Sequence, residues 1–136
     1  MPNMIIAGVV AVALLFGGLL FASNDNAKPQ STQPAFTEVA QALGQGAKLY
    51  DVRTADEFAA NHFEGALNWS LQDLQAGKLP DVPKDTVLYV YCKSGNRSGQ
   101  ATALLKENGF TNITDLGGLA SVQAAGGTLI EKGYTL

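Results

Sequence analysis

The chain has 136 residues and a formal net charge of -3, from 9 basic and 12 acidic side chains. This length suits one domain of about 100 residues after an apolar leader, and the mild charge offers no basic face for nucleic acid. One cysteine excludes an internal disulfide, and one cysteine with one histidine cannot furnish a zinc shell made by the protein alone. We expect no bound metal, no cofactor and no nucleic-acid partner.

The amino-terminal residues 1–22 are predicted to be a membrane anchor or an export signal. From Met4 to Ala22 every residue is apolar or glycine, and the first charged side chain is Asp25. A run of about 20 such residues crosses the hydrocarbon core of a bilayer. An uncleaved anchor formed by residues 4–22 is favoured, because the segment lacks the basic residues and the cleavage site typical of a signal peptide. The domain that follows is expected in the periplasm or outside the cell; if the signal is cleaved, the domain is soluble in the periplasm.

Residues 23–35 are predicted to be a flexible linker, and residues 36–136 a single α/β domain. The linker is polar, carries two prolines and shows no apolar periodicity. Beyond it, strands alternate with short helices, which predicts an open parallel β-sheet flanked by helices. We expect helices after Thr37 and over 55–61, 71–76, 100–108 and 119–125, and strands over 48–52, 66–69, 87–91 and 111–116. Capping residues mark three helix starts: Thr37, Thr54 with Glu57, and Ser70 with Asp73.

The single cysteine, Cys92, follows the strand predicted over 87–91 and precedes a polar loop and a helix. Loop N–H groups, the positive end of the helix dipole, and the side chains of Lys93 and Arg97 favour thiolate over thiol at such a position. We therefore predict a thiol pKa below about 8.5 and a role as a nucleophile. The alternative is that Cys92 is a small buried hydrophobic residue.

Short motifs along the domain point to a known family. They are Asp51-Val52-Arg53, Glu57-Phe58, His62-Phe63, Gly65-Ala66-Leu67-Asn68, Cys92-Lys93-Ser94-Gly95-Asn96-Arg97-Ser98 and Leu116-Gly117-Gly118. On these residues, residues 36–136 resemble the rhodanese-like sulfurtransferases. Within that family, a leader followed by one such domain is similar to the small exported rhodaneses of the phage-shock-protein-E type.

The resemblance implies a sulfur-transfer reaction at Cys92. Its thiolate would accept a sulfane sulfur from thiosulfate or a persulfide and pass it to cyanide, a thiol or another thiophilic acceptor. The loop would bind this small sulfur-containing substrate through Lys93, Ser94, Gly95, Asn96, Arg97 and Ser98. The sequence identifies no protein acceptor.

Other functions compete with this prediction. One is a membrane-tethered sulfur carrier or binding module with little turnover of its own. Another is a phosphatase or arsenate reductase, whose related loop places the cysteine and the arginine one residue further apart. Four residues separate Cys92 from Arg97, and this shorter loop suits one sulfur atom better than a tetrahedral oxyanion. A dithiol redox enzyme is disfavoured, because the chain has no second cysteine to resolve a mixed disulfide.

Four further motif residues are expected near the site in structural roles. Glu57 is explained by the capping box, and Asp51 by a solvated or capping carboxylate. Arg53 is expected in an ion pair or as a loop anchor, with Glu57 as a candidate partner. His62 could serve as a general base for Cys92, but analogy with the family favours a loop-organising role.

Overall fold

The computed structural model describes residues 33–133 of the chain. The predicted anchor and nearly all of the predicted linker lie outside the described residues, so they remain predictions. Within residues 33–133, no helix combines the length and the apolar character needed to span a bilayer. The described residues belong to one compact unit.

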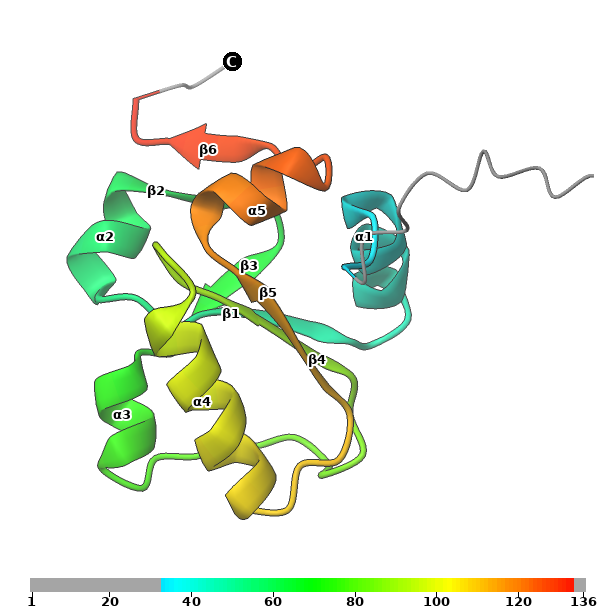
Figure 1. Ribbon diagram of the computed structural model, residues 1–136, viewed down its shortest axis with the longest axis vertical. Coiled ribbons are helices and arrows are strands. Elements are labelled where there is room, and N and C mark those ends of the chain that lie inside the picture. The colour runs from blue at the N-terminus through cyan, green and yellow to red at the C-terminus, as the bar shows by residue number, and fades with distance from the viewer. Residues whose placement is uncertain (1–32, 134–136) are drawn as a thin grey trace, which may run out of the picture. The chain divides into compact units, whose positions relative to one another are not determined.

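The centre of the domain is a four-stranded parallel sheet with the strand order β3-β1-β4-β5 (Figure 1). Its strands are β1 (Lys48–Asp51), β3 (Ala66–Asn68), β4 (Leu88–Tyr91) and β5 (Ile113–Gly117). In the register of the sheet, Tyr50 lies between Leu67 on one side and Val90 on the other. The carboxyl ends of all four strands therefore share one edge, which is where open parallel sheets bind ligands. The expected α/β fold is confirmed.

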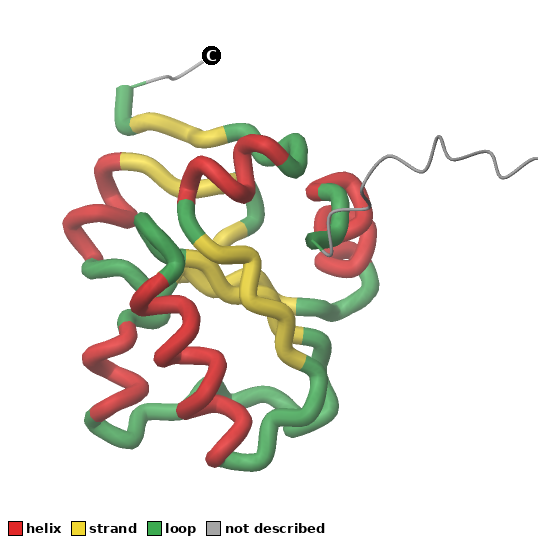
Figure 2. Tube along the Cα trace, viewed as in Figure 1, coloured by secondary structure: helices red, strands yellow, loops and turns green. Residues whose placement is uncertain are grey.

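Two helices cover each face of the sheet, as Figures 1 and 2 show. Leu88 and Val90 of β4 pack with α3 and α4, whereas Tyr91 packs with α1 and α5 on the opposite face. This division follows from the alternation of side chains along a strand. The helices are α1 (Phe36–Gly44), α3 (Leu71–Gln75), α4 (Asn96–Glu107) and α5 (Leu119–Ala124).

A short antiparallel ribbon completes the domain and was not predicted. Helix α2 (Ala55–Ala60) leads directly into β2 (Asn61–Phe63), which pairs with β6 (Leu129–Glu131). Each strand has only three residues, too few for an alternating pattern to be recognised in the sequence. The ribbon places the fully buried Phe63 opposite Leu129.

The start of α4 differs from the prediction. The helix begins at Asn96, not at Gln100, so residues expected in the loop form its first turn. Gly95 at the N-cap position has a φ of 97°, a left-handed conformation that strongly favours glycine. The cysteine loop is therefore shorter than the sequence indicated, and the helix N-terminus lies closer to Cys92.

Of the predicted helix caps, two are confirmed and one is wrong. The hydroxyls of Thr54 and Ser70 accept the backbone N–H groups of Glu57 and Asp73. The first helix, in contrast, has Ala35 at its N-cap and no side-chain cap. Thr37 thus lies inside α1, one residue after its start.

Candidate active site

Cys92 lies at the carboxyl end of the central strand β4 and is fully buried. Its N–H donates to the carbonyl oxygen of Gly117 at 2.9 Å, which ties the residue to the end of the neighbouring strand β5. The thiol therefore occupies the ligand-binding edge of the sheet, as predicted.

The sulfur of Cys92 is surrounded by hydrogen-bonding groups of its own loop. The N–H of Gly95 donates to Sγ at 2.9 Å, and the hydroxyl oxygen of Ser98 lies 3.5 Å from Sγ. Burial by itself raises the pKa of the thiol, but the Ser98 hydroxyl and the backbone N–H groups of Ser98, Gly95 and Ser94 more than offset it. The net result is a pKa below that of an ordinary cysteine, in the predicted direction.

The physical cause of this lowered pKa is only partly the predicted one. Hydrogen bonds from the loop backbone and from Ser98 are responsible, and the charges of Lys93 and Arg97 are not among the leading causes. Ser98 is itself fully buried, and its hydroxyl lies 3.0 Å from the carbonyl oxygen of Gly95. A rotation of this one hydroxyl can therefore direct its proton to the carbonyl or to the thiolate.

The Gly117-Gly118 turn braces the cysteine loop by direct backbone contact. Ser94 and Gly118 form an isolated antiparallel bridge, and the N–H of Leu119 donates to the carbonyl oxygen of Lys93 at 3.1 Å. A Cβ atom at Gly118 would lie only 2.6 Å from that carbonyl oxygen. The glycine is thus required by the close approach of two backbone segments.

Arg97 makes a bidentate ion pair with Glu57, at 2.8 and 2.9 Å. Hydrogen bonds from Arg97 lower the pKa of Glu57 to about 2 against the opposing effect of burial, so the pair is charged at neutral pH. The interpretation of Glu57 as a capping residue alone was therefore incomplete. Its pairing with Arg97, 40 residues away in the sequence, left no local signal.

Asp51 and Arg53 form a second, buried ion pair at the end of β1. Arg53 donates from Nε to Oδ1 at 2.9 Å and from Nη2 to Oδ2 at 2.7 Å, and its backbone N–H also reaches Oδ1. The side chain of Asp51 is fully buried, so the solvated alternative is wrong. The capping alternative is supported, because the carboxylate accepts the backbone N–H of Arg53. The ion pair expected for Arg53 exists, but its partner is Asp51 and not Glu57.

Tyr91 links this ion pair to the strand that precedes the cysteine. Its hydroxyl donates to Oδ2 of Asp51 at 3.0 Å and accepts the N–H of Phe63 at 3.2 Å. Burial raises the pKa of Tyr91, so the hydroxyl stays protonated and available as a donor. Sequence reasoning treated Tyr91 as part of an apolar strand and missed this role.

His62 is held by α2 and makes no hydrogen bond with Cys92 among those described. Its ring stacks on Phe58 at a centroid distance of 4.1 Å, and Nδ1 lies 2.9 Å from the carbonyl oxygen of the same residue. The hydrogen bonds of the Cys92 sulfur are instead with Gly95 and Ser98. The contacts described for the His62 ring are with Phe58, so its role as a loop-organising residue or as a general base stays a prediction.

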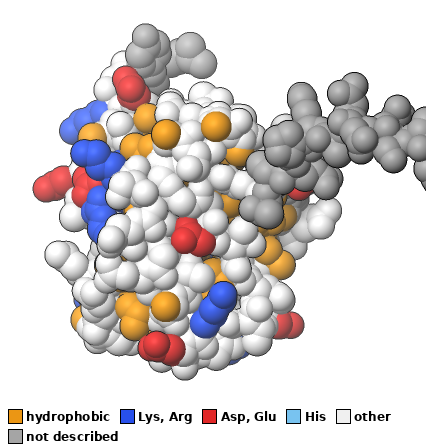
Figure 3. Space-filling model, viewed as in Figure 1, with side chains coloured by type: hydrophobic (Ala, Val, Ile, Leu, Met, Phe, Trp, Pro, Cys, Tyr) orange, Lys and Arg blue, Asp and Glu red, His pale blue; other side chains and the backbone are white. Residues whose placement is uncertain are grey.

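The loop cations differ in their surroundings. Lys93 is exposed and has no carboxylate within ion-pair distance in the described part of the chain, whereas Arg97 is paired and partly buried. Figure 3 shows basic and acidic side chains gathered together at the left edge, the side on which Figure 1 places α2. Residues 33–133 contain no cluster of histidine, cysteine or carboxylate side chains that could hold a metal ion.

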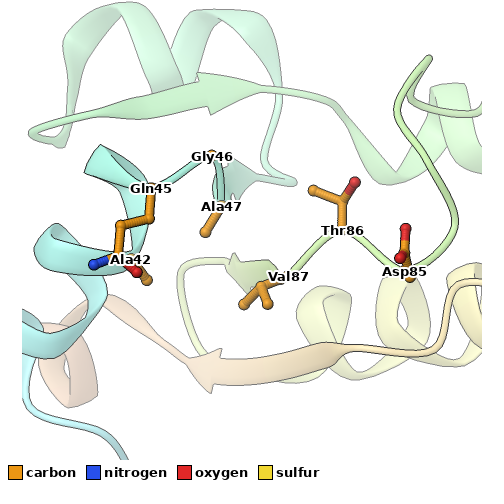
Figure 4. Close-up of a pocket in the computed structure, with 7 residues that line it drawn as sticks. All are labelled: Ala42, Gln45, Gly46, Ala47, Asp85, Thr86 and Val87. Carbon is orange, nitrogen blue, oxygen red and sulfur yellow. The ribbon is translucent and has the colours of Figure 1, made fainter.

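The part of the chain that the structure describes has pockets at both ends of the parallel strands. The α3 pocket, of about 210 Å³, is near their carboxyl ends and is lined by Val52, Thr54, Ser70, Leu71, Gln72, Gln75 and Arg97. Another, of about 340 Å³, opens where β1 and β4 begin (Figure 4) and is lined by Ala42, Gln45, Gly46, Ala47, Asp85, Thr86 and Val87. Its position at the amino ends of the strands separates it from Cys92.

We predict that Tyr91→Phe destabilises the protein by about 1–3 kcal/mol, because the change leaves the buried N–H of Phe63 without its acceptor and removes a donor to Asp51. Tyr89→Phe is the matched control, since no hydroxyl hydrogen bond is described for half-buried Tyr89, and it should change stability by less than about 0.5 kcal/mol. Urea denaturation measures both. Equal losses in the two variants would show that the buried network contributes nothing beyond ring packing.

We also predict that Ser98→Ala raises the pKa of the Cys92 thiol, because it removes the side-chain hydrogen bond that favours the thiolate. Ser94→Ala keeps its backbone N–H and should leave the thiol pKa where it is in the wild type. Thiolate absorbance titrated against pH gives both midpoints. A midpoint that Ser98→Ala leaves in place would assign the low pKa to the backbone alone.

Comparison with known proteins identifies the family. A model of the rhodanese-like domain matches residues 35–125. The thiosulfate sulfurtransferase PspE of Escherichia coli is 36% identical over 73 residues, covering 53% of this chain and 70% of that protein. The uncharacterized protein YqhL of Bacillus subtilis is 31% identical over 118 residues, 87% of this chain and 90% of that protein. A solved structure of rhodanese with anions from Escherichia coli is 30% identical, with a TM-score of 0.53 over 63% of this chain and 99% of that one. The chain therefore belongs to the rhodanese-like domain family of sulfurtransferases.

Proposed function

We propose that the protein is a sulfurtransferase of the thiosulfate type, which carries a sulfane sulfur on Cys92. The observation on which this depends is the set of N–H groups around the sulfur, contributed by Ser94, Gly95 and Ser98. These donors would stabilise the thiolate before transfer and the persulfide anion after it. They cost no rearrangement at the moment of reaction, because the backbone already holds them in place.

The reaction divides into two balanced displacements. In the first, the Cys92 thiolate attacks the outer sulfur of thiosulfate, an S–S bond forms at Cys92, and the S–S bond of thiosulfate breaks to release sulfite. In the second, the thiolate of an acceptor attacks the outer sulfur of the persulfide, and Cys92 leaves as the thiolate. A persulfide donor or a cyanide acceptor enters the same two steps, and no external oxidant or reductant is required.

The two loop cations would have different tasks. Lys93 is exposed and without an ion-pair partner among the described residues, so it would attract an anionic donor. Arg97 is fixed by Glu57, so it would hold the loop and present its remaining donors to the substrate. Ser94, Gly95, Asn96 and Ser98 would complete the loop that encloses the transferred sulfur.

We further propose that the apolar run of residues 4–22 anchors the protein to a membrane, with the domain in the periplasm or outside the cell. The length of the run and its lack of charge support the anchor. Fractionation of expressing cells should recover the protein with the membranes. Recovery as a shortened soluble protein in a periplasmic extract would show that the segment is a cleaved signal.

We predict that the wild-type protein gains the mass of one sulfur atom after treatment with thiosulfate and loses it after cyanide, as measured by intact-mass analysis. Cys92→Ser should show neither change, because a serine hydroxyl is not ionised there and forms no persulfide.

Lys93→Ala should raise the KM for thiosulfate roughly two- to five-fold, and high salt should shrink this effect. Arg97→Ala should lower the rate of sulfur transfer from thiosulfate more than Lys93→Ala does, but not below the rate of Cys92→Ser.

A steady-state assay with thiosulfate and cyanide separates an enzyme from a sulfur carrier. An enzyme regenerates free Cys92 and consumes many equivalents of thiosulfate in the presence of cyanide. A carrier loads once and then exchanges sulfur too slowly for steady-state turnover. Full activity in Cys92→Ser would overturn the proposed chemistry altogether.

A further inference from the structure

The α3 pocket lies next to the first turn of α4, which follows the cysteine loop, and next to the buried cluster that contains Cys92. Arg97 lines the pocket and belongs to the first turn of α4, which starts directly after the loop. Val52 and Leu71, also in the lining, belong to the same buried cluster as Cys92. The N–H of Val52 donates to the carbonyl oxygen of Tyr91, the residue before Cys92, at 3.0 Å.

The polar groups of the pocket suit a ligand with a single carboxylate. Arg97 has five N–H donors, and Glu57 uses two of them, so others remain for a ligand. Gln72 and Gln75 bring exposed amides from α3, and Ser70 brings a hydroxyl. Because Glu57 neutralises Arg97, the pocket carries little net charge. Thiosulfate, a small dianion without an extended body, has no further part for the amides of Gln72 and Gln75 to bind.

We propose that the α3 pocket binds the carboxylate-bearing end of a small thiol, the sulfur acceptor of the second displacement. This inference rests on the proposed function and specifies its acceptor. The carboxylate is held by the free donors of Arg97, and the amides of Gln72 and Gln75 bind the rest of the molecule. The volume of about 210 Å³ lies below the range of about 300–1,000 Å³ typical of larger ligands, so the occupant is of amino-acid size. Its thiolate attacks the outer sulfur of the persulfide, and the S–S bond at Cys92 breaks as in the second step above.

The test compares two acceptors that differ in charge, mercaptopropionate and mercaptoethanol, on full-length protein preloaded with sulfur by thiosulfate. Gln72→Glu and Gln75→Glu each place a negative charge at the pocket. We expect either change to lower the ratio of second-order rate constants, mercaptopropionate over mercaptoethanol, by roughly five-fold. High salt should restore part of the ratio. Gln41→Glu on α1 has the same change of charge at an exposed position away from the pocket and should keep the wild-type ratio.

Each other outcome has a distinct meaning. A wild-type ratio in both pocket variants would overturn the acceptor site while leaving the sulfurtransferase function intact. Slower loading by thiosulfate, to the same extent as the loss with mercaptopropionate, would show that the pocket serves the donor and would overturn the proposal. A wild-type protein that forms no persulfide with thiosulfate or with a persulfide donor would instead refute the proposed function itself.

Discussion

The arrangement of the site depends on the hydrogen bonds that the buried carboxylate of Asp51 makes with Arg53 and Tyr91. A charge without solvent is costly unless it is paired and fully hydrogen-bonded, and Asp51 meets this requirement with Arg53 and the hydroxyl of Tyr91. These contacts join the end of β1 to the end of β4. Tyr91 also accepts the N–H of Phe63 in β2. Because Tyr91 immediately precedes Cys92, the network fixes the strand end from which the cysteine loop departs.

Backbone groups of the loop favour ionisation of the buried Cys92 thiol. A buried thiol resists ionisation, and the loop counters this with N–H groups and one hydroxyl directed at the sulfur. Two glycines make the geometry possible: Gly95 takes the left-handed turn into α4, and Gly118 lets the neighbouring turn approach the carbonyl oxygen of Lys93. The thiolate therefore depends little on the positive side chains of the loop. Of these, Lys93 is exposed, whereas Arg97 is paired with Glu57.

That difference connects the two proposals. An unpaired exposed cation attracts any small anion over a distance of about 10 Å, which suits the capture of a sulfur donor. A guanidinium that is already neutralised by a carboxylate selects by geometry more than by charge, which suits recognition of a particular acceptor. The α3 pocket lies beside Arg97. Under the two proposals, one short loop and the helix next to it would distinguish the sulfur donor from the acceptor.

The sequence by itself determined the features that depend on neighbouring residues. Short local patterns predict the alternation of strands and helices and the caps at Thr54 and Ser70. They also predict the position of Cys92 between a strand and a helix. The family motifs extended this local information to the fold and to the candidate site.

Only the tertiary structure decided which charged and polar groups meet. Glu57 and Arg97, like Asp51 and Tyr91, are 40 residues apart in the sequence, so their contacts appear only when β1, β4, α2 and α4 pack together. The ribbon of β2 and β6 joins strands of three residues, which carry too little pattern to predict a partner. The sequence thus placed Cys92, because its surroundings are local, whereas the pairing of Arg97 and the pocket beside it exist only through long-range packing.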